Sequence, residues 1–219
     1  MSVTALHDFF AILAIVAFIG VVLMVLARII PSVASVRFLD GLHKVNLWLA
    51  ALVATTASLG SLYMSEYGNH WEPCRFCWFQ RIFMYSLAVI LLVAAIRRDR
   101  TVKWFAVPLA VIGICASTWH ILIEHRVVEE SAACFNVQSC ANPWRVSFGT
   151  LDFSTGTLVT SGMPITLAVM AFCGFAAILA LLLTPESLAS EPLTPEILTP
   201  APLTSAQPEA EEDGQSSAG

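Results

Sequence analysis

Residues 72–81 read Glu-Pro-Cys-Arg-Phe-Cys-Trp-Phe-Gln-Arg, a C-x-x-C dithiol that opens a long apolar run. Pro73 suits the first position of a helix, because its missing N–H has no intrahelical partner there. We therefore expect a helix from Pro73, with Cys74 and Cys77 near its first turn and on one face. The positive end of the helix dipole favours thiolate over thiol, and Arg81 adds a fixed charge one turn further on. The stretch predicts a redox centre at a membrane surface.

Zinc binding is the main alternative for this motif, because a C-x-x-C pair is also half of many zinc sites. A second pair, Cys134 and Cys140, lies in another polar stretch, with 56 residues between the two pairs and five residues between its own cysteines. Zinc ribbons use two short knuckles separated by roughly 15–20 residues. The spacing favours redox chemistry, and we expect no metal here.

The composition is that of a membrane protein. Of the 219 residues 57% are hydrophobic and 12% are charged, whereas soluble domains carry about 25% charged residues. The net charge of −5 comes with no basic face for nucleic acid. Cys115 and Cys173 lie inside apolar runs, where cysteine behaves as a small hydrophobic residue. The other four cysteines form two pairs near polar loops, which suits an oxidising extracytoplasmic compartment.

Five apolar segments are long enough to cross a membrane. They cover residues 9–30, 45–64, 74–96, 104–123 and 163–183. We expect an all-α integral membrane protein, in which the last four segments form a four-helix transmembrane bundle and the first is an additional N-terminal transmembrane helix. That first segment lacks the preceding basic residues of a cleaved signal peptide.

Positive charge predicts the orientation of these segments. Arg28, Arg37 and Lys44 follow the first segment, and the densest basic cluster, residues 97–103, follows the third. Short cytoplasmic loops are rich in Lys and Arg. We therefore expect the N-terminus and both cysteine pairs outside, and the C-terminus in the cytoplasm.

Three parts follow from this pattern. Residues 1–41 are expected to form the additional helix and a cytoplasmic loop, residues 42–183 the redox bundle, and residues 184–219 a Pro-rich acidic tail without Lys, Arg or aromatic residues that should be disordered. The loop at residues 124–162 is too long for a simple connection, and long loops are often functional. Its apolar residues either lie on the membrane, dock a partner or pack the loop itself.

The segment from Cys74 to Arg81, followed by Ile82-Phe83-Met84-Tyr85, resembles the DsbB/BdbC family of bacterial disulfide-bond formation proteins. The resemblance covers about residues 42–183 and includes the short basic loop, the outer cysteine pair and a last span that begins at Met163-Pro164. It implies a thiol:quinone oxidoreductase in the bacterial inner membrane. Such a protein reoxidises an extracytoplasmic thioredoxin-fold oxidase (DsbA-like) and passes the electrons to a membrane quinone, ubiquinone or menaquinone.

The same resemblance assigns a role to each loop cysteine. Cys134 would form a mixed disulfide with the partner, and Cys140 would exchange with the pair at the membrane edge. Cys74 would receive that exchange, and Cys77 would form the thiolate–quinone adduct or charge-transfer complex.

Arg81 matches the arginine that contacts the quinone ring oxygen, and His120 with Glu124 resembles a His…Gln pair near the outer end of a core helix. Some family members have an acid where this chain has Gln80. Two simpler interpretations stay open: Arg81 can snorkel to lipid headgroups, and His120 can be an interfacial histidine with a polar partner.

Two other classes of protein also fit a membrane chain with two cysteine pairs. Proteins similar to vitamin K epoxide reductase couple thiols to quinones, but their loop pair precedes the C-x-x-C motif along the chain. A membrane scaffold with structural disulfides would keep both pairs oxidised under mild reductant.

Overall fold

The computed structural model describes residues 3–30, 32–67, 73–129, 139–141, 145–147, 150–152, 157–159 and 164–185, all in one compact unit, Met1–Ser187. Beyond Pro185 the expected tail lies outside the described residues. Cys134, in the long loop, also lies outside them. The described helices are α1 (Val3–Ile29), α2 (Val33–Glu66), α3 (Arg75–Arg97), the 3-10 helix η1 (Arg100–Val102), α4 (Lys103–Glu124) and α5 (Leu167–Leu182).

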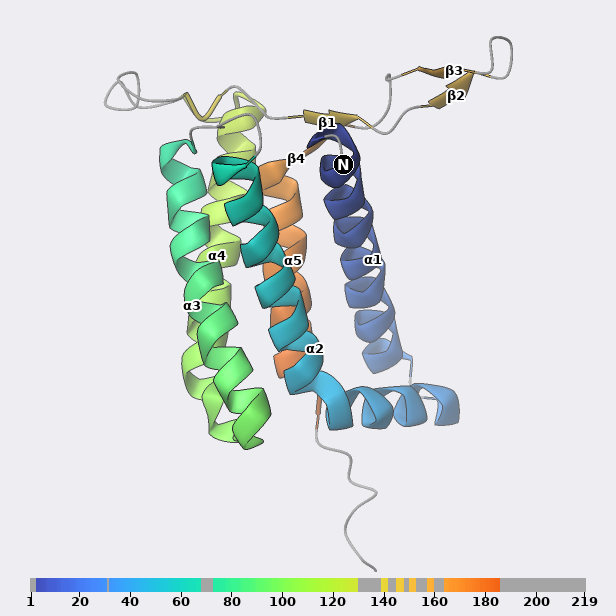
Figure 1. Ribbon diagram of the computed structural model, residues 1–219. Helices are drawn as coiled ribbons and strands as arrows, with labels where there is room; N and C mark the ends of the chain where they lie inside the picture. The colour runs from blue at the N-terminus through green and yellow to red at the C-terminus, as the bar shows by residue number, and fades with distance from the viewer. Residues whose placement is uncertain are drawn as a thin grey trace, which may run out of the picture. The chain divides into compact units, whose positions relative to one another are not determined.

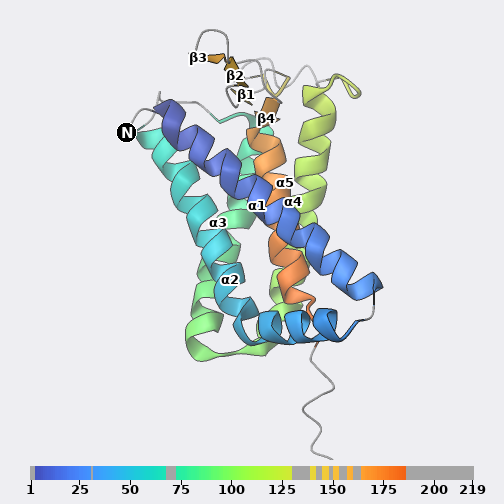
Figure 2. The same cartoon turned by 90° about the vertical axis from the view of Figure 1, so that its right-hand side faces the viewer.

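Helices α2 to α5 form a four-helix bundle, with α2 and α4 each packed against both α3 and α5. Helix α1 lies obliquely across α2 and α5 (Figures 1 and 2). The bundle interior holds many alanines, including Ala50, Ala54, Ala106 and Ala110, none of them exposed. Small residues let helix backbones approach closely in a membrane protein. The predicted all-α membrane bundle with one extra N-terminal helix is confirmed.

Within the described residues, four helical segments are long and apolar enough to cross a membrane: His7–Ile29, Val33–Glu66, Arg75–Arg97 and Arg100–Glu124. Helix α5 has 16 residues, or about 24 Å at 1.5 Å per residue, which is short of a hydrocarbon core of roughly 30 Å. The strand β4 (Pro164–Thr166) precedes it and adds about 10 Å of extended chain. The two elements together have the length of the predicted fifth span.

Three predicted helix starts were wrong, and capping side chains explain two of the shifts. Helix α5 begins at Leu167 and not at Pro164, because Thr166 Oγ1 accepts a hydrogen bond from the Val169 N–H at 3.3 Å. Helix α2 begins at Val33, twelve residues before the predicted span, and Ser32 caps it. Its first part carries the basic residues predicted for a loop, and it runs across the ends of the other helices (Figure 1).

The third shift concerns the dithiol helix α3, which begins at Arg75 and not at Pro73. Cys74 is the N-cap residue, with extended backbone angles of φ −64° and ψ 170°. Its Sγ accepts a hydrogen bond from the Cys77 N–H at 3.4 Å. The first cysteine therefore lies just outside the helix and the second in its first turn.

Short strands in the long loop were not predicted. Strand β1 (Arg145–Ser147) pairs antiparallel with β4, and Val146 lies opposite Ile165. Strand β2 (Thr150–Asp152) pairs antiparallel with β3 (Thr157–Val159), and Leu151 lies opposite Leu158. The β1–β4 pair ties part of the loop to the start of α5.

Candidate redox site

The dithiol lies at the end of the bundle where α3 begins, which we call the thiol end. Cys74 and Cys77 are free thiols whose Sγ atoms are 2.8 Å apart. Cys74 is 4% exposed, and Cys77 is half-buried. Cys74 caps the helix from outside and belongs to a small buried cluster, whereas Cys77, in the first turn, packs against that cluster and also lines a cavity.

Cys140 is the neighbour of Cys74. It is 1% exposed and packs with Cys74 and Ile123 in a small buried cluster. The hydrogen bond with Cys140 lowers the pKa of Cys74, but the hydrogen bond with Cys77 and burial outweigh it and raise that pKa to about 12. Burial and the neighbouring Cys77 thiol therefore favour the neutral thiol at Cys74, in opposition to the helix dipole. The structure brings one predicted loop cysteine to the dithiol.

His120 of α4 lies on the other side of Cys74, with Nε2 3.5 Å from the Cys74 Sγ. Gln80 Nε2 is 3.4 Å from His120 Nδ1 and donates to Ser117 Oγ at 3.2 Å. If the amide N–H donates to Nδ1, the proton of the neutral ring is on Nε2 and faces Cys74. The Phe76 ring stacks on the imidazole, with ring centroids 5.9 Å apart. These contacts fix the orientation of a buried histidine beside a thiol.

Glu124 continues this network towards α5. Its Oε1 is 3.8 Å from His120 Nε2, and its Oε2 accepts a hydrogen bond from Thr166 Oγ1 at 2.7 Å. The side chains of His120 and Glu124 are only 4% and 5% exposed. A carboxylate buried beside a histidine gives that histidine a partner for a second proton.

Arg81 lies one turn below Cys77. Its Nη2 donates to the Ser61 carbonyl at 3.3 Å, and its guanidinium carbon is 5.6 Å from the centroid of the Trp78 ring. No ion pair with a carboxylate is formed by Arg81 in the part of the chain that the structure describes. Its charge therefore remains available to a ligand.

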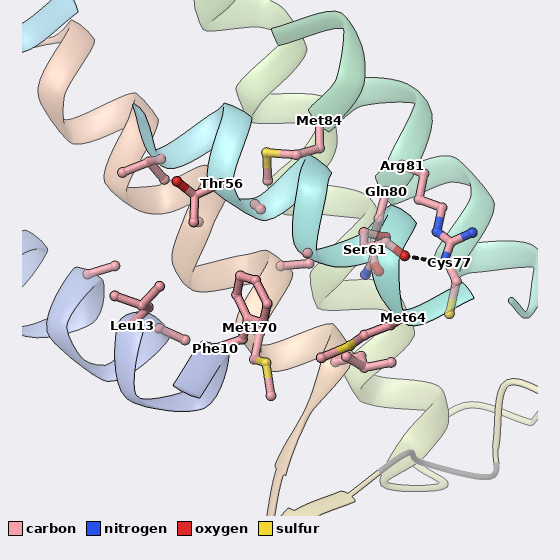
Figure 3. Close-up of a pocket in the computed structure, with 18 of the residues that line it drawn as sticks. Phe10, Leu13, Thr56, Ser61, Met64, Cys77, Gln80, Arg81, Met84 and Met170 are labelled. Atoms are coloured by element: carbon pink, nitrogen blue, oxygen red, sulfur yellow. Dashed lines mark hydrogen bonds between the residues drawn. The ribbon is translucent and has the colours of Figure 1, made fainter. Parts of the chain in front are cut away.

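A cavity of about 530 Å³ begins at Cys77, Gln80 and Arg81 and is lined by α1, α2, α3 and α5. Figure 3 shows Arg81 and Cys77 on one side of it and Phe10 and Leu13 of α1 across from them. Most of the remaining lining is aliphatic, aromatic or methionine side chains. A largely apolar space with a thiol, an amide and a guanidinium in one part of its lining suits an apolar molecule with a polar head.

The thiol end also offers metal ligands. The Sγ atoms of Cys74 and Cys77 and one ring nitrogen of His120 lie within 4.8 Å of one another. Thiolate and imidazole are the ligands that zinc prefers. The sequence argument against a metal considered only the spacing of cysteines and did not include a histidine from another helix.

Several residues of the site were missed at the sequence level. Ser117, Phe76 and Thr166 hold His120 and Glu124 in place but belong to no recognised motif. Helical spacing was the available signal, because Ser117 lies three residues before His120, and Gln80 three after Cys77. Thr166 had no such signal, because it reaches Glu124 from another segment.

A family model described as disulfide bond formation protein DsbB matches residues 44–185. The chain belongs to this family. The resemblance predicted from the dithiol helix is thereby confirmed, and the chain is a multi-pass membrane protein of a disulfide-generating family.

Individual relatives agree with this assignment. A probable disulfide formation protein of Deinococcus radiodurans is 42% identical over 149 residues, which cover 67% of this chain and 92% of that protein. A probable disulfide formation protein C 2 of Bacillus cereus is 30% identical over 144 residues, covering 66% and 93%. The disulfide bond formation protein C of Bacillus subtilis is 45% identical over 78 residues, covering 36% and 56%. No solved structure matches this chain.

Proposed function

We propose that the protein is a thiol:quinone oxidoreductase that reoxidises an extracytoplasmic thioredoxin-fold oxidase of the DsbA type. One observation carries this proposal: of the two cysteines of a single C-x-x-C motif, one is buried with the loop cysteine and the other also lines the cavity. Cys74 contacts the loop cysteine Cys140, whereas Cys77 lines the cavity beside Arg81. A relay between a protein partner and a membrane electron acceptor needs this division.

The cavity fits a quinone by the chemistry of its lining. Arg81 can donate to a ring oxygen that gains negative charge on reduction, and the apolar remainder suits an isoprenoid chain. A quinone would supply the final acceptor for two electrons and two protons. Cys77 and Arg81 would hold its ring, and the chemistry fits ubiquinone and menaquinone alike.

Thiol–disulfide exchange carries the electrons to Cys77. A partner thiolate attacks the Cys134–Cys140 disulfide at Cys134, the mixed disulfide is resolved by the second partner thiol, and the released Cys140 thiolate attacks Cys74 of the Cys74–Cys77 disulfide. Each exchange forms one S–S bond and breaks one. The partner leaves oxidised. Cys134 then attacks Cys140 of the Cys74–Cys140 disulfide, which restores the outer disulfide and leaves Cys74 and Cys77 as a reduced pair that holds the two electrons.

His120 donates a hydrogen bond in this scheme. Its Nε2 lies between Cys74 Sγ and Glu124 Oε1, so with the ring proton on Nε2 it can donate a hydrogen bond to the thiolate that forms on Cys74 during exchange. Gln80 holds the ring through Nδ1. His120 is therefore proposed to stabilise the Cys74 thiolate, and Gln80 is proposed as a positioning residue.

The same proposal fixes the location. The thiol end would face the extracytoplasmic side of the bacterial inner membrane, where disulfides persist. Residues 42–183 would form the redox domain, with the N-terminus outside and the tail in the cytoplasm. Lipid would contact the exposed apolar side chains of α1 and α3, such as Ile19 and Val89.

The test mixes the purified full-length protein with a reduced thioredoxin-fold oxidase and a quinone and follows quinone absorbance. We expect catalytic loss of absorbance with oxidation of the partner, and no turnover in Cys77→Ser. Cys115→Ser is the matched control, because Cys115 is exposed on α4. Quinone reduction that continues in Cys77→Ser would contradict the proposal.

Metal binding is a second candidate, favoured by the proximity of Cys74, Cys77 and His120. Elemental analysis of the purified protein distinguishes the two candidates. Stoichiometric zinc that blocks both thiols from alkylation supports a metal site, whereas rapid alkylation after reduction, without loss of a metal, supports the redox site.

A further inference from the structure

Helix α1 supplies one wall of the cavity. Its lining residues recur at positions i, i+3, i+4 and i+7, which places them on one helix face. These residues are Phe10, Leu13, Ala14 and Ala17, and Phe9 and Val16 line the cavity beside them. Leu13 lies across the cavity from Arg81 (Figure 3), so this wall faces the polar end of the space.

The lining residues of α2 form a matching stripe along the facing side of that helix, and α2 runs antiparallel to α1 (Figure 1). This stripe includes Val53, Ala57 and Gly60. At Gly60 the two helices are in close contact. A Cβ added there would lie 2.2 Å from Cζ of the Phe10 ring, closer than non-bonded atoms approach. Phe10 therefore fixes α1 against α2 at this level.

The cavity changes character along the two stripes. Ser61, next to Gly60, accepts the hydrogen bond from Arg81, so the polar end lies at the level of Phe10. Val53 lies seven residues from Gly60, or about 10 Å along the helix axis. Over this distance Ala14, Ala17 and Ala57 leave open space between the helices.

This wall is an addition to the family bundle. The family match begins at residue 44, whereas α1 ends at Ile29. The Deinococcus relative uses 92% of its length in the 149 matched residues, which leaves about 13 residues outside them, fewer than the roughly 20 that a membrane span needs. Such a relative has no room for a further helix of this length.

We propose that α1 binds the isoprenoid tail of the quinone. The protein would then distinguish quinones by their tails. The inference rests on the proposed function, since Cys77 and Arg81 place the quinone ring at the polar end. The tail then extends along the stripe of small side chains between α1 and α2. A phospholipid acyl chain has similar chemistry, and the experiment separates the two occupants.

The experiment compares two electron acceptors, a quinone with an isoprenoid tail and the same ring without one, in the full-length protein with reduced partner. Ala17→Phe fills the far end of the cavity. We expect its KM for the tailed quinone to rise about tenfold, as the loss of contacts with one or two CH2 groups implies, and its KM for the tail-less quinone to stay unchanged. Leu13→Ala, which removes contacts without adding bulk, should act in the same direction.

Ile19→Phe is the matched control, because Ile19 lies on α1, is 51% exposed and does not line the cavity. A second readout needs no turnover: organic extraction should recover less tailed quinone from purified Ala17→Phe than from Ile19→Phe. If the KM for the tailed quinone is the same in Ala17→Phe as in Ile19→Phe, the inference is overturned, and an acyl chain is indicated in the cavity. Failure of the unaltered protein to reduce either quinone would instead contradict the proposed function.

Discussion

Both ends of the bundle bury a histidine, and the two are surrounded by different chemistry. At the end opposite the thiols, His43 Nδ1 lies 3.3 Å from the Thr184 carbonyl, and Arg100 contacts its Nε2. Asn46 donates to Thr184 Oγ1 at 3.0 Å and to the Leu181 carbonyl at 3.3 Å. These bonds join α2, η1 and the end of α5, so this network holds helix ends together.

At the thiol end, the neighbours of His120 are a thiol, a carboxylate and an amide, and a cavity begins within one helical turn. Backbone carbonyls neither give nor take protons at neutral pH, whereas thiols and carboxylates do. A buried histidine therefore indicates function only through its partners. The comparison predicts that substitutions at the thiol end reduce turnover, whereas those at the opposite end reduce stability.

The largest effect is expected from Cys140→Ser, which removes the sulfur that contacts Cys74. Turnover should stop, because the outer disulfide cannot form. Cys134, left as a free thiol, should form a mixed disulfide with the oxidised partner, and this product should accumulate because Cys140 is not there to attack Cys134 and release the partner. Non-reducing gel electrophoresis followed by peptide mass spectrometry measures this product. Trapping of the partner on Cys74 or Cys77 would reverse the direction of the relay.

His120→Ala should lower turnover roughly ten- to a hundredfold, since a hydrogen bond to a charged group such as the Cys74 thiolate contributes about 1.5–3 kcal/mol, and it should change the thermal midpoint little. Thiol exchange and quinone absorbance are followed separately in stopped-flow experiments. A large loss of stability with normal rates per folded molecule would make His120 a structural residue like His43.

Arg81→Ala should weaken quinone use roughly ten- to a hundredfold, since a hydrogen bond to a charged group contributes about 1.5–3 kcal/mol. Arg81→Lys should restore only part of this, because the planar fork is lost. The measurement is the KM and kcat for quinone at saturating partner. Unchanged values in the alanine variant would assign Arg81 to headgroup contact.

The smallest effect on turnover is expected from Asn46→Ala at the opposite end. Its side chain is 1% exposed, and its loss leaves the end of α5 with fewer bonds, at a cost of about 1–3 kcal/mol of stability. Denaturant unfolding in detergent gives the stability, and the quinone assay gives the rate. A rate loss as large as that of His120→Ala would abolish the distinction between the two ends.

The sequence predicted those features that lie within one continuous stretch. The membrane spans followed from hydropathy, the dithiol helix from Cys74 to Arg81 from its motif, and the His120–Glu124 contact from helical spacing. The early start of α2 was missed because its charged residues lower the local hydropathy. The strand before α5 was missed because proline also suits a helix start.

Apart from the Cys140–Cys74 exchange that the family resemblance implied, contacts between distant segments had no signal in the sequence. The approach of Cys140 to Cys74 depends on how a long loop folds, and the cavity depends on the packing of four helices. The part that α1 plays in the cavity depends on one glycine, Gly60, which admits Phe10. Periodicity places residues on a face of a helix, but it does not say which helix that face meets.

The central claim is that Cys74 faces Cys140 whereas Cys77 faces the cavity. It is tested most directly by disulfide trapping in two variants that each lack Cys134 and one cysteine of the dithiol. Under mild oxidant, the variant with Cys134→Ser and Cys77→Ser should form a Cys74–Cys140 disulfide, detected as a cross-linked peptide by mass spectrometry. The variant with Cys134→Ser and Cys74→Ser should form little Cys77–Cys140 disulfide. Equal yields in the two variants, or a higher yield with Cys77, would contradict the account.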